Sequence, residues 1–484
     1  MNKILLIYPP GKPFQRGEDR CQINLDDCAT QNIRACNDLG YAAAVLKKKN
    51  YEIQLKDYQS EKLSDEDLFS DIKTYNPDLI LISTTNTTIF DDLALIKKVK
   101  EFSRASIVLK GAIFYAPEKE MLKQLDLTDV DVLIGGEIDF IIDKVADYLL
   151  KGEGNLTQVP SILYKDKNEE FTPTEFNNWD EDLDKQPFPA RHLMNNSLYV
   201  RPDTGEVMAT IQTARGCPSE CIFCITPQIS GKKIRLRSPQ NIMEELFECY
   251  EKYNIKNFFF RADSFTFDEK WVNELCTLII NSKLWKKIQF TANGRVKPLK
   301  KETLQIMKKA GCFTIAFGFE SGSEETMKKI KKGATLQDNK QAMSWAKEIG
   351  LPVLGMFMIG FPWEDKTHIE DTKKLIYELE PDFIEITLAL PFYGTQLYDI
   401  CLEQNLVKAP VYGSDFFNAS LTETTKLTTS ELLEIRKNIL LSYYLRPKYI
   451  FKKVINTILK PKVLLNYFKY GFRLLITLLT KGKR

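Results

Sequence analysis

Two stretches of the 484-residue chain alternate between short apolar runs and helical patterns, and a basic helical tail follows them. The apolar runs show little polar alternation, which is typical of parallel strands buried on both faces. The sequence therefore predicts an α/β protein with a doubly wound parallel sheet (Rossmann-like), a partial (β/α)6 TIM-like barrel and a helical C-terminal region. The expected parts are residues 1–165, a linker over 166–203, the barrel over 204–400 and the tail over 401–484.

The composition is that of folded domains and excludes disordered, collagen-like and coiled-coil proteins, with 44% apolar and 27% charged residues. Sixty-seven basic residues nearly balance 65 acidic ones, so net charge does not indicate a nucleic-acid partner. No run of about 18 apolar residues occurs, and the first apolar run is too short for a signal peptide. We expect a cytoplasmic protein, in which ten cysteines indicate metal ligation or buried thiols rather than disulfides.

The first part alternates strands and helices and ends in a polar, proline-rich stretch. The expected strands are Lys3–Tyr8, Tyr51–Leu55, Asp78–Ser83, Ser106–Lys110 and Val130–Ile134, and the expected helices are Leu39–Asn50 and Phe90–Phe102. Ligands of doubly wound sheets bind beyond the carboxyl ends of the strands. Those ends carry Thr84, Gly111 and the run Gly135, Gly136 and Glu137.

The second part predicts six strands with helices between them. The expected strands are Met208–Ala214, Asn257–Phe260, Ile288–Ala292, Phe313–Phe317, Val353–Met358 and Phe383–Leu388. The expected helices are Asn241–Tyr253, Glu269–Asn281, Lys300–Ala310, Gln337–Ile349 and Thr367–Leu379. Six such units close part of an eight-fold barrel, whose catalytic face is built from the loops after the strands.

Three thiols with the spacing C-x3-C-x2-C follow the first barrel strand, at Cys217, Cys221 and Cys224. Thiolates are the ligands of iron–sulfur clusters, and a cubane with a complete ligand set needs four. A loop this short can hold three corners of one cube. The fourth iron is then left without a protein ligand, and an open metal site is where catalysis takes place.

The alternative to a cluster is a structural zinc site, which would need a fourth ligand. The chain has only two histidines, His192 and His368. Cys249, Cys276 and Cys312 fall on expected helix or strand positions, where core thiols are common. The pattern favours the cluster.

The cysteine motif, with Phe223 before its third cysteine, resembles the radical S-adenosylmethionine (SAM) superfamily. The resemblance implies a [4Fe-4S] cluster whose open iron chelates the amino and carboxylate groups of SAM. One electron then cleaves the sulfonium to give a 5′-deoxyadenosyl radical. It also implies an electron donor such as flavodoxin or ferredoxin.

Later strand ends resemble the same family. The resemblance implies that Asp263 meets the methionine amino group and that Arg295 approaches the SAM carboxylate. Glu320 and Ser321 would complete the SAM site, followed by Phe357–Glu364 after the fifth strand. The alternative for Asp263 and Glu320 is a structural salt bridge or helix cap, and for Arg295 a structural role.

The first part resembles the cobalamin-binding domain that precedes many radical SAM barrels. The matching stretches are Lys3–Pro10, Asp38–Leu46, Pro77–Ser83, Asp131–Glu137 and the linker Gln186–Arg191. The resemblance implies cobalamin at the strand ends carrying Thr84, Gly111, Gly135, Gly136 and Glu137. Two features depart from it: no histidine lies in this part to ligate cobalt, and Lys110-Gly111-Ala112 replaces a pair of glycines. A domain that serves structure or binds something else is the alternative.

Cys21, Cys28 and Cys36 lie in one long loop after the first strand. They could hold a second metal, but close ligand spacing is missing. A local structural role is favoured.

The tail from residue 435 to 484 has thirteen Lys or Arg and no Asp or Glu. After Pro461, the polar stripe Lys462, Asn466, Lys469 and Arg473 marks an otherwise apolar helix. Packing on the barrel, a membrane surface or lipid-like substrate, and RNA or a protein partner are the alternatives, with nucleic acid disfavoured. The helix should not span a bilayer, because a Lys or Arg at its centre costs about 2.5–3.5 kcal/mol. Peripheral attachment to the inner membrane face would suit it.

The resemblances together imply a cobalamin-dependent radical SAM enzyme, a methyltransferase acting on an unactivated carbon of a small-molecule or lipid-like substrate. A radical cyclase or rearrangement enzyme would use the same residues. A tRNA-modifying enzyme is disfavoured because no RNA-binding domain is evident. A cobalamin sensor would not need the cysteines. No pattern names the substrate.

Overall fold

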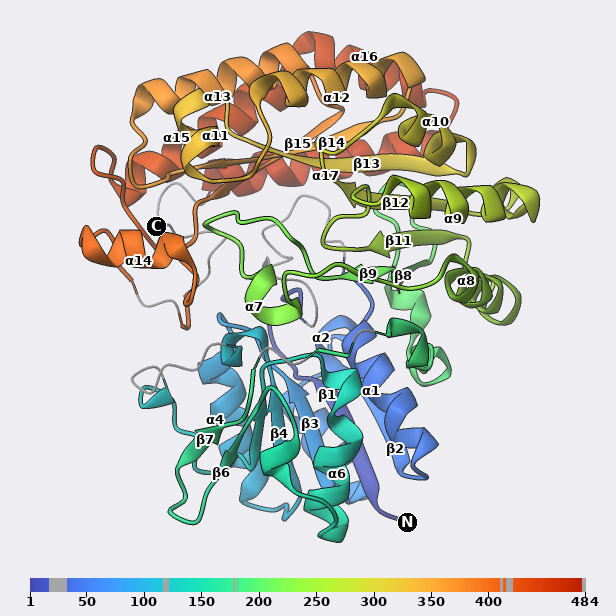
Figure 1. Cartoon of the computed structure of the whole chain (residues 1–484), viewed down its shortest axis with the longest axis vertical. Coiled ribbons are helices and arrows are strands. Elements are labelled where there is room, and N and C mark those ends of the chain that lie inside the picture. The colour runs from blue at the N-terminus through green and yellow to red at the C-terminus, as the bar shows by residue number, and fades with distance from the viewer. Residues whose placement is uncertain are drawn as a thin grey trace.

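The computed structural model describes residues 1–16, 33–115, 122–176, 179–180, 182–409, 412–414 and 421–480, the last without the side chains of 477–480. Figure 1 shows the N-terminal sheet domain below and the second sheet above it, with the C-terminal helices packed against the second sheet. The predicted α/β fold class is confirmed.

The N-terminal sheet has the strand order β2-β1-β3-β4-β5-β6-β7. Its strands are β1 (Lys3–Tyr8), β2 (Glu52–Asp57), β3 (Leu79–Ser83), β4 (Ser106–Lys110), β5 (Val132–Ile134), β6 (Ile162–Lys165) and β7 (Phe171–Pro173). The first five are parallel, but β6 and β7 are antiparallel, so the sheet is mixed. Strand β7 lies in the stretch expected to be linker. A short turn is enough to join antiparallel strands, whereas a parallel pair needs a long crossover.

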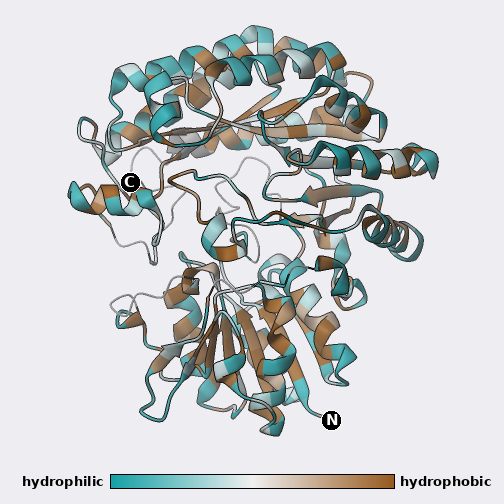
Figure 2. Cartoon of the chain, viewed as in Figure 1, coloured by the Kyte–Doolittle hydropathy of each residue, from teal (hydrophilic) through white to brown (hydrophobic). Residues whose placement is uncertain are grey.

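Both faces of this sheet are covered, as the apolar strands predict. Ile4, Leu6 and Tyr8 belong to one buried cluster, and the intervening Leu5 and Ile7 belong to another. Successive strand residues point to opposite faces, so a run that is apolar throughout needs helices on both. Figure 2 shows these apolar strands between helices with polar outer faces. The helices are α1 (Asn37–Lys48), α2 (Tyr58–Glu61), α3 (Asp65–Tyr75), α4 (Ile89–Lys100) and α6 (Ile142–Lys151).

The second sheet is an open, all-parallel barrel fragment with the order β15-β14-β13-β12-β11-β8. Its strands are β8 (Met208–Gln212), β11 (Asn257–Arg261), β12 (Gln289–Gly294), β13 (Cys312–Glu320), β14 (Val353–Ile359) and β15 (Phe383–Leu388). Its helices are α7 (Thr226–Ser230), α8 (Pro239–Tyr253), α9 (Glu269–Asn281), α10 (Lys301–Lys309), α11 (Glu324–Lys329), α12 (Leu336–Ile349) and α13 (Lys366–Leu379). All six predicted strands are present, and β8 and β15 form the two edges.

A buried ion-pair triad fastens the connecting segment to the barrel. Arg191, which follows the prolines of this segment, donates to Glu245 Oε1 on α8 at 2.6 Å, and Arg237 donates to Glu245 Oε2 at 2.5 Å. Burial alone would raise the pKa of Glu245, but the two guanidinium groups hold it below its ordinary value. The segment is therefore fixed against the outside of the barrel.

The C-terminal region is helical, with α14 (Gln396–Glu403), α15 (Thr429–Tyr444), α16 (Pro447–Thr457) and α17 (Pro461–Thr480). The last two begin at prolines, as expected for a residue that favours the first helical turn. The Tyr443 hydroxyl of α15 donates to the Pro381 carbonyl before β15. On α17, the Tyr467 ring lies 6.0 Å from that of Phe383, and Asn466 Nδ2 donates to the Asp203 carbonyl at 2.9 Å. Helix α17 thus contacts the segments leading into both edge strands.

Candidate active site between two sets of strand ends

The carboxyl ends of the two sheets face each other across a charged interface. Arg215 Nη1 lies 3.0 Å from Asp139 Oδ2 and 3.3 Å from Glu137 Oε2, and Arg235 Nη2 lies 2.5 Å from Glu137 Oε1. All four side chains are at most 7% exposed. The arginines come from the antiparallel pair β9 (Ala214–Arg215) and β10 (Arg235–Leu236), and the carboxylates follow β5. The strand ends of both domains therefore build one region.

The cysteine loop starts directly after β9 and is fixed through its backbone. Gly216 has a φ of +86°, and a Cβ there would collide with the Lys233 carbonyl, so the turn requires glycine. The Gly216 N–H donates to Asp263 Oδ2 at 2.8 Å, and the Cys217 N–H donates to the Gly231 carbonyl at 3.1 Å. The loop conformation is thus set by contacts with the segment after β11 and with the turn after α7.

The three thiols of the loop differ in exposure. Cys217 is buried, and Cys221 and Cys224 are half-buried. The Cys224 thiol donates to Thr226 Oγ1 at 3.1 Å. Burial raises the pKa of Cys221 to about 11, against the opposing charges of Lys332 and Arg295.

Among the described residues, the three thiols are not gathered around a single point. Within the described part of the chain, no group of three or more His, Cys, Asp or Glu side chains converges tightly enough to hold one ion. Zinc would require thiolates about 2.3 Å from a common centre. The corners of a cubane lie apart from one another, so three ligands on one loop need not meet at one point.

The other described cysteines are all buried in the cores of the two domains. Cys249, Cys276, Cys312 and Cys401 are buried in the barrel core. Cys36 is also buried, and its sulfur lies 3.2 Å from the Tyr199 hydroxyl. Cys21 and Cys28 lie outside the described residues, so the proposed second metal site stays untested.

Arg295 connects β12 to the cysteine loop. Its Nη1 donates to Ser219 Oγ at 2.5 Å, between the first two cysteines, and its Nη2 donates to the Lys332 carbonyl at 2.6 Å. Arg295 therefore positions the cysteine loop, and this role does not depend on a contact between Arg295 and a bound ligand.

Glu320 occupies an irregular point at the end of β13. Its φ of +62° lies in the left-handed region, and the pairing of β13 with β14 shifts register between Gly318 and Glu320. The Lys332 ammonium donates to the Glu320 carboxylate and to the Gly318 carbonyl. A non-glycine residue in this conformation costs about 1–3 kcal/mol, and such strain gathers at functional sites.

Ser321 and Asp263, which the resemblance places in the SAM site, both make hydrogen bonds within the protein. Ser321 is fully buried, and its hydroxyl lies 3.1 Å from Thr372 Oγ1 and accepts from the Ser323 N–H. It shapes the turn after β13 and offers no accessible atom to SAM. Asp263 lines the interface cavity but also holds the Gly216 amide. Both are on the correct strand ends, but their contacts are those of supporting residues.

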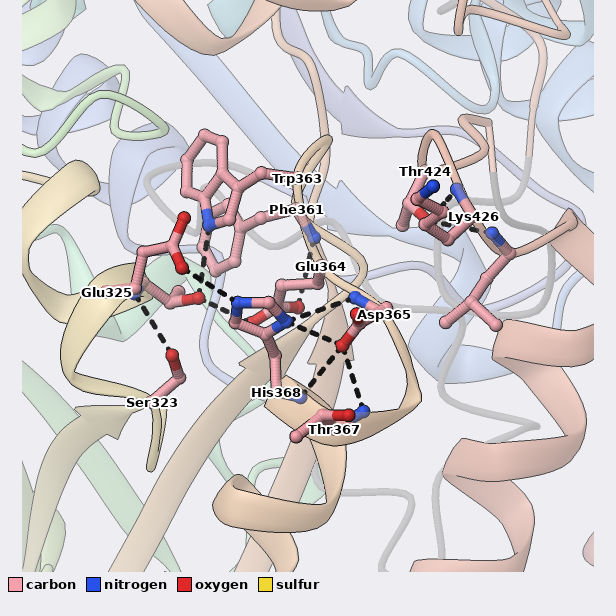
Figure 3. A network of polar contacts seen from close by, with 12 residues as sticks. Ser323, Glu325, Phe361, Trp363, Glu364, Asp365, Thr367, His368, Thr424 and Lys426 are labelled. Atoms are coloured by element: carbon pink, nitrogen blue, oxygen red, sulfur yellow. Dashed lines mark hydrogen bonds and ion pairs between the residues drawn. The ribbon is translucent and has the colours of Figure 1, made fainter.

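The segment after β14 supports the aromatic residue of the cysteine motif. The Phe223 ring lies 6.0 Å from that of Phe361, which stacks on Trp363 with a centroid distance of 5.4 Å. Buried Glu364 accepts from the Gly360 N–H at 2.8 Å and the Phe361 N–H at 3.2 Å. Figure 3 shows this turn beside the polar contacts of His368 with Asp365 and Glu325. A network outside the cysteine loop therefore fixes one of its packing partners.

The N-terminal strand ends are occupied by internal contacts. Thr84 is buried and donates to Asp92 Oδ2 at 2.6 Å, and a Cβ at Gly111 would press on Thr84. A Cβ at Gly135 would collide with the Phe114 backbone, and one at Gly136 with Ser161. Packing within the domain thus explains Thr84 and the glycines, although Gly135, Gly136 and Glu137 do line the interface cavity.

The cavity between the domains is about 50 Å³. Drug-sized ligands occupy pockets of about 300–1,000 Å³, and cobalamin is larger than those ligands. At its edge Lys110 Nζ lies 2.8 Å from Asp38 Oδ2, and Asp38 Oδ1 accepts from the Tyr8 hydroxyl at 2.5 Å. Burial opposes ionisation of Asp38, but Lys110 holds its pKa below the ordinary value. Among the described residues, the cavity between the strand ends is therefore smaller than such a ligand.

Sequence patterns did not reveal several residues of this region. Arg215 was visible next to the cysteine motif, but its partners Asp139 and Glu137 lie 76 and 78 positions away in the numbering. Lys332 follows a helix and carries no local signature. Only the packing of distant strand ends brings these charges together.

Comparison with known proteins agrees with this geometry. Residues 211–376 match the sequence profile of the radical SAM superfamily. A Pyrococcus horikoshii protein named as an uncharacterized methyltransferase is 29% identical over 422 residues, covering 86% of this chain and 89% of that protein. The cytidylyl-2-hydroxyethylphosphonate methyltransferase of Streptomyces wedmorensis is 26% identical, covering 84% of this chain and 82% of its own length.

The fold is also similar to that of OxsB, described as a cobalamin-dependent S-adenosylmethionine radical enzyme and solved with aqua-cobalamin and S-adenosylmethionine bound. The TM-score is 0.72 at 14% sequence identity, over 97% of this chain and 72% of that one. The matched profile spans the strand ends that carry the cysteine loop, Glu320 and Arg295. Residues 211–376 of the chain therefore belong to the radical SAM superfamily, and the protein is an enzyme.

Proposed function

We propose that this enzyme cleaves SAM at a [4Fe-4S] cluster held by Cys217, Cys221 and Cys224 and methylates an unactivated carbon of a small-molecule or lipid-like substrate. The observation that carries the proposal is a loop of three free cysteines within eight residues, at the carboxyl end of an open parallel barrel. Methyl transfer is supported by the names of both relatives, each of which is aligned over most of its length.

Different residues of the chain have different roles at this site. Arg295 and Asp263 hold the loop at Ser219 and Gly216, so that the three thiols are presented from a fixed backbone. Glu320 and Lys332 form a charged pair near Cys221, suited to the carboxylate, amino or hydroxyl groups of SAM. When bound, the cluster would supply one electron to the SAM sulfonium. Ser321 is left out of this proposal because its hydroxyl is buried.

Cobalamin is proposed as the second cofactor, to carry the methyl group, because the fold matches that of an enzyme solved with it. Its site would lie between the domains, beside Gly135, Gly136 and Glu137. Since the cavity there is about 50 Å³, the contacts of Arg235 and Arg215 with Glu137 would have to separate first.

Anaerobic turnover with SAM labelled in its methyl group tests the proposal. Reconstituted enzyme, an electron source such as reduced flavodoxin, cobalamin and candidate substrates should yield 5′-deoxyadenosine and a labelled methylated product. Deoxyadenosine with an unmethylated, rearranged product would replace methyl transfer by the cyclase alternative. Absence of SAM cleavage by protein that contains iron and sulfide would contradict the proposal altogether.

A further inference from the structure

The exposed large apolar side chains of this protein gather on its last two helices. Seventeen such residues occur in the described chain, and ten of them lie between Leu445 and Ile476. Phe451 is 69% exposed, Leu459 92%, Leu465 68% and Phe472 66%. Single exposed apolar residues are normal, but a concentration of this kind marks an interaction surface.

The apolar residues of α17 form one continuous face. Leu465, Phe468, Phe472 and Ile476 are exposed and recur every three or four positions, so they lie on one side of the helix. Lys462 and Lys469 are exposed along the edge of the same face. We call these six residues the α17 face.

The polar stripe expected on α17 is turned partly toward the protein. Asn466 and Arg473 are half-buried, and Asn466 donates to the Asp203 carbonyl. Tyr467, next to it, packs on Phe383 of β15. A helix that packs only on its own barrel would bury its apolar side and expose the polar one, so packing alone does not account for this orientation.

Helix α16 also combines exposed apolar side chains with an exposed lysine. Phe451 and Ile455 are exposed on this helix, Ile458 and Leu459 are exposed just after its end, and Lys452 is 56% exposed beside them. Helix α16 contacts α17. Apolar side chains with Lys along the margin are typical of helices lying in a membrane interface, where the ammonium groups reach lipid phosphates.

Charge argues for an anionic partner. From residue 435 to 484 the chain has thirteen basic and no acidic residues. Association of two copies through this face would place like charges against each other, because a two-fold interface is self-complementary. RNA would leave the aliphatic side chains without a partner, since it is bound by charge and aromatic stacking.

We propose that α16 and the α17 face dock this enzyme on an anionic lipid bilayer, with both helices in the plane of the interface. The attachment is peripheral: within the described chain no helix is both long and apolar enough to cross a membrane. Docking is independent of the reaction proposed above, because no residue of the face contributes to the cysteine loop or its supports.

Flotation of the full chain with vesicles tests the proposal. It should float with equimolar phosphatidylcholine–phosphatidylglycerol vesicles and much less with phosphatidylcholine alone. Raising the salt from about 0.1 M to about 1 M shortens the screening length from about 10 to about 3 Å and should weaken binding.

Two double variants separate the apolar and basic contributions. Phe468→Ser with Phe472→Ser should lower the partition coefficient by about tenfold or more. Lys462→Gln with Lys469→Gln should lower it by about 25-fold, at about fivefold for each basic residue near an anionic surface. The matched controls are Phe247→Ser on α8, 37% exposed, and Lys309→Gln on α10, also exposed. Neither control should change flotation, and all variants should keep the iron content and melting temperature of the parent.

Four results would overturn the proposal. The first is failure to bind anionic vesicles, and the second is binding that both double variants leave unchanged. The third is a dimer in sedimentation that Phe468→Ser with Phe472→Ser dissociates without any vesicle binding, which would make the face a contact between copies. Binding to RNA in place of vesicles would equally contradict docking on lipid.

Discussion

The two sets of strand ends that meet between the domains both belong to parallel strands, but their side chains are arranged differently. On the barrel side, the cysteine loop is held by its backbone and by Arg295, and two of its three thiols remain partly exposed. On the N-terminal side, Thr84 and Asp38 are buried with hydrogen-bonding partners. Ion pairs from Arg215 and Arg235 cover what remains.

The cysteine loop is accessible as it stands, whereas the site at the N-terminal strand ends must open before a ligand can bind. Under the proposed function, the barrel side would need only its metal and sulfide to become a cluster site. On the N-terminal side, a ligand of cobalamin's size would have to replace protein contacts, and buried ion pairs are costly to break. Cofactor loading should therefore depend on the charges of the interface more than on the glycines of the N-terminal domain.

The largest effect is expected from the cysteine loop. Cys217→Ala, Cys221→Ala and Cys224→Ala should each abolish stable cluster binding and lower SAM cleavage on the order of 10³-fold or more, because the loop supplies all the ligands. Iron and sulfide analysis with a 5′-deoxyadenosine assay measures this. Cys276→Ala, a buried core thiol, is the matched control. It should cost about 1–2 kcal/mol of stability and leave the iron content unchanged. Full iron content in a triplet variant would refute the ligand assignment.

The second largest effect is expected at the ion pair between Arg235 and Glu137, which joins the two domains. Arg235→Met removes one partner of a buried pair with Glu137 and should destabilise the folded protein by about 3 kcal/mol. It should also speed cobalamin uptake, since the contact no longer has to separate. Denaturant unfolding and stopped-flow absorbance measure the two effects. The matched control is Lys301→Met, whose pair with Glu348 is largely exposed and worth about 0–1 kcal/mol. Slower or unchanged uptake by Arg235→Met would contradict the opening of this interface.

The smallest effect is expected at His368, beside the turn after β14. Partial burial lowers its pKa, but hydrogen bonds to Asp365 and Glu325 outweigh this and hold the pKa above the ordinary value. The stabilisation is therefore complete below the unfolded-state pKa of about 6.5 and lost as pH rises through the raised folded value. His368→Gln should cost about 0.5–1 kcal/mol at low pH and little in alkaline buffer. Unfolding measured across this range checks it, and an equal cost at all pH values would exclude the ion pairs as the cause.

Local patterns in the sequence predicted most of the fold. The strand Phe383–Leu388 and the helix Glu269–Asn281 were predicted with the bounds that the structure has, because apolar periodicity, caps and prolines are local signals. The antiparallel strand β7 was missed, since a three-residue strand of half-exposed residues carries no periodicity. On α17 the polar stripe was recognised, but its orientation was not.

The sequence by itself determined that the cysteine loop carries three thiols close together. Three thiols within eight residues are close in space whatever the rest of the chain does. Only the tertiary structure decided which charges surround that loop, that Ser321 is buried, that Arg235 meets Glu137 and that α17 exposes its apolar side. These properties depend on contacts between residues tens to hundreds of positions apart. Such contacts arise from the packing of whole elements, which no local pattern encodes.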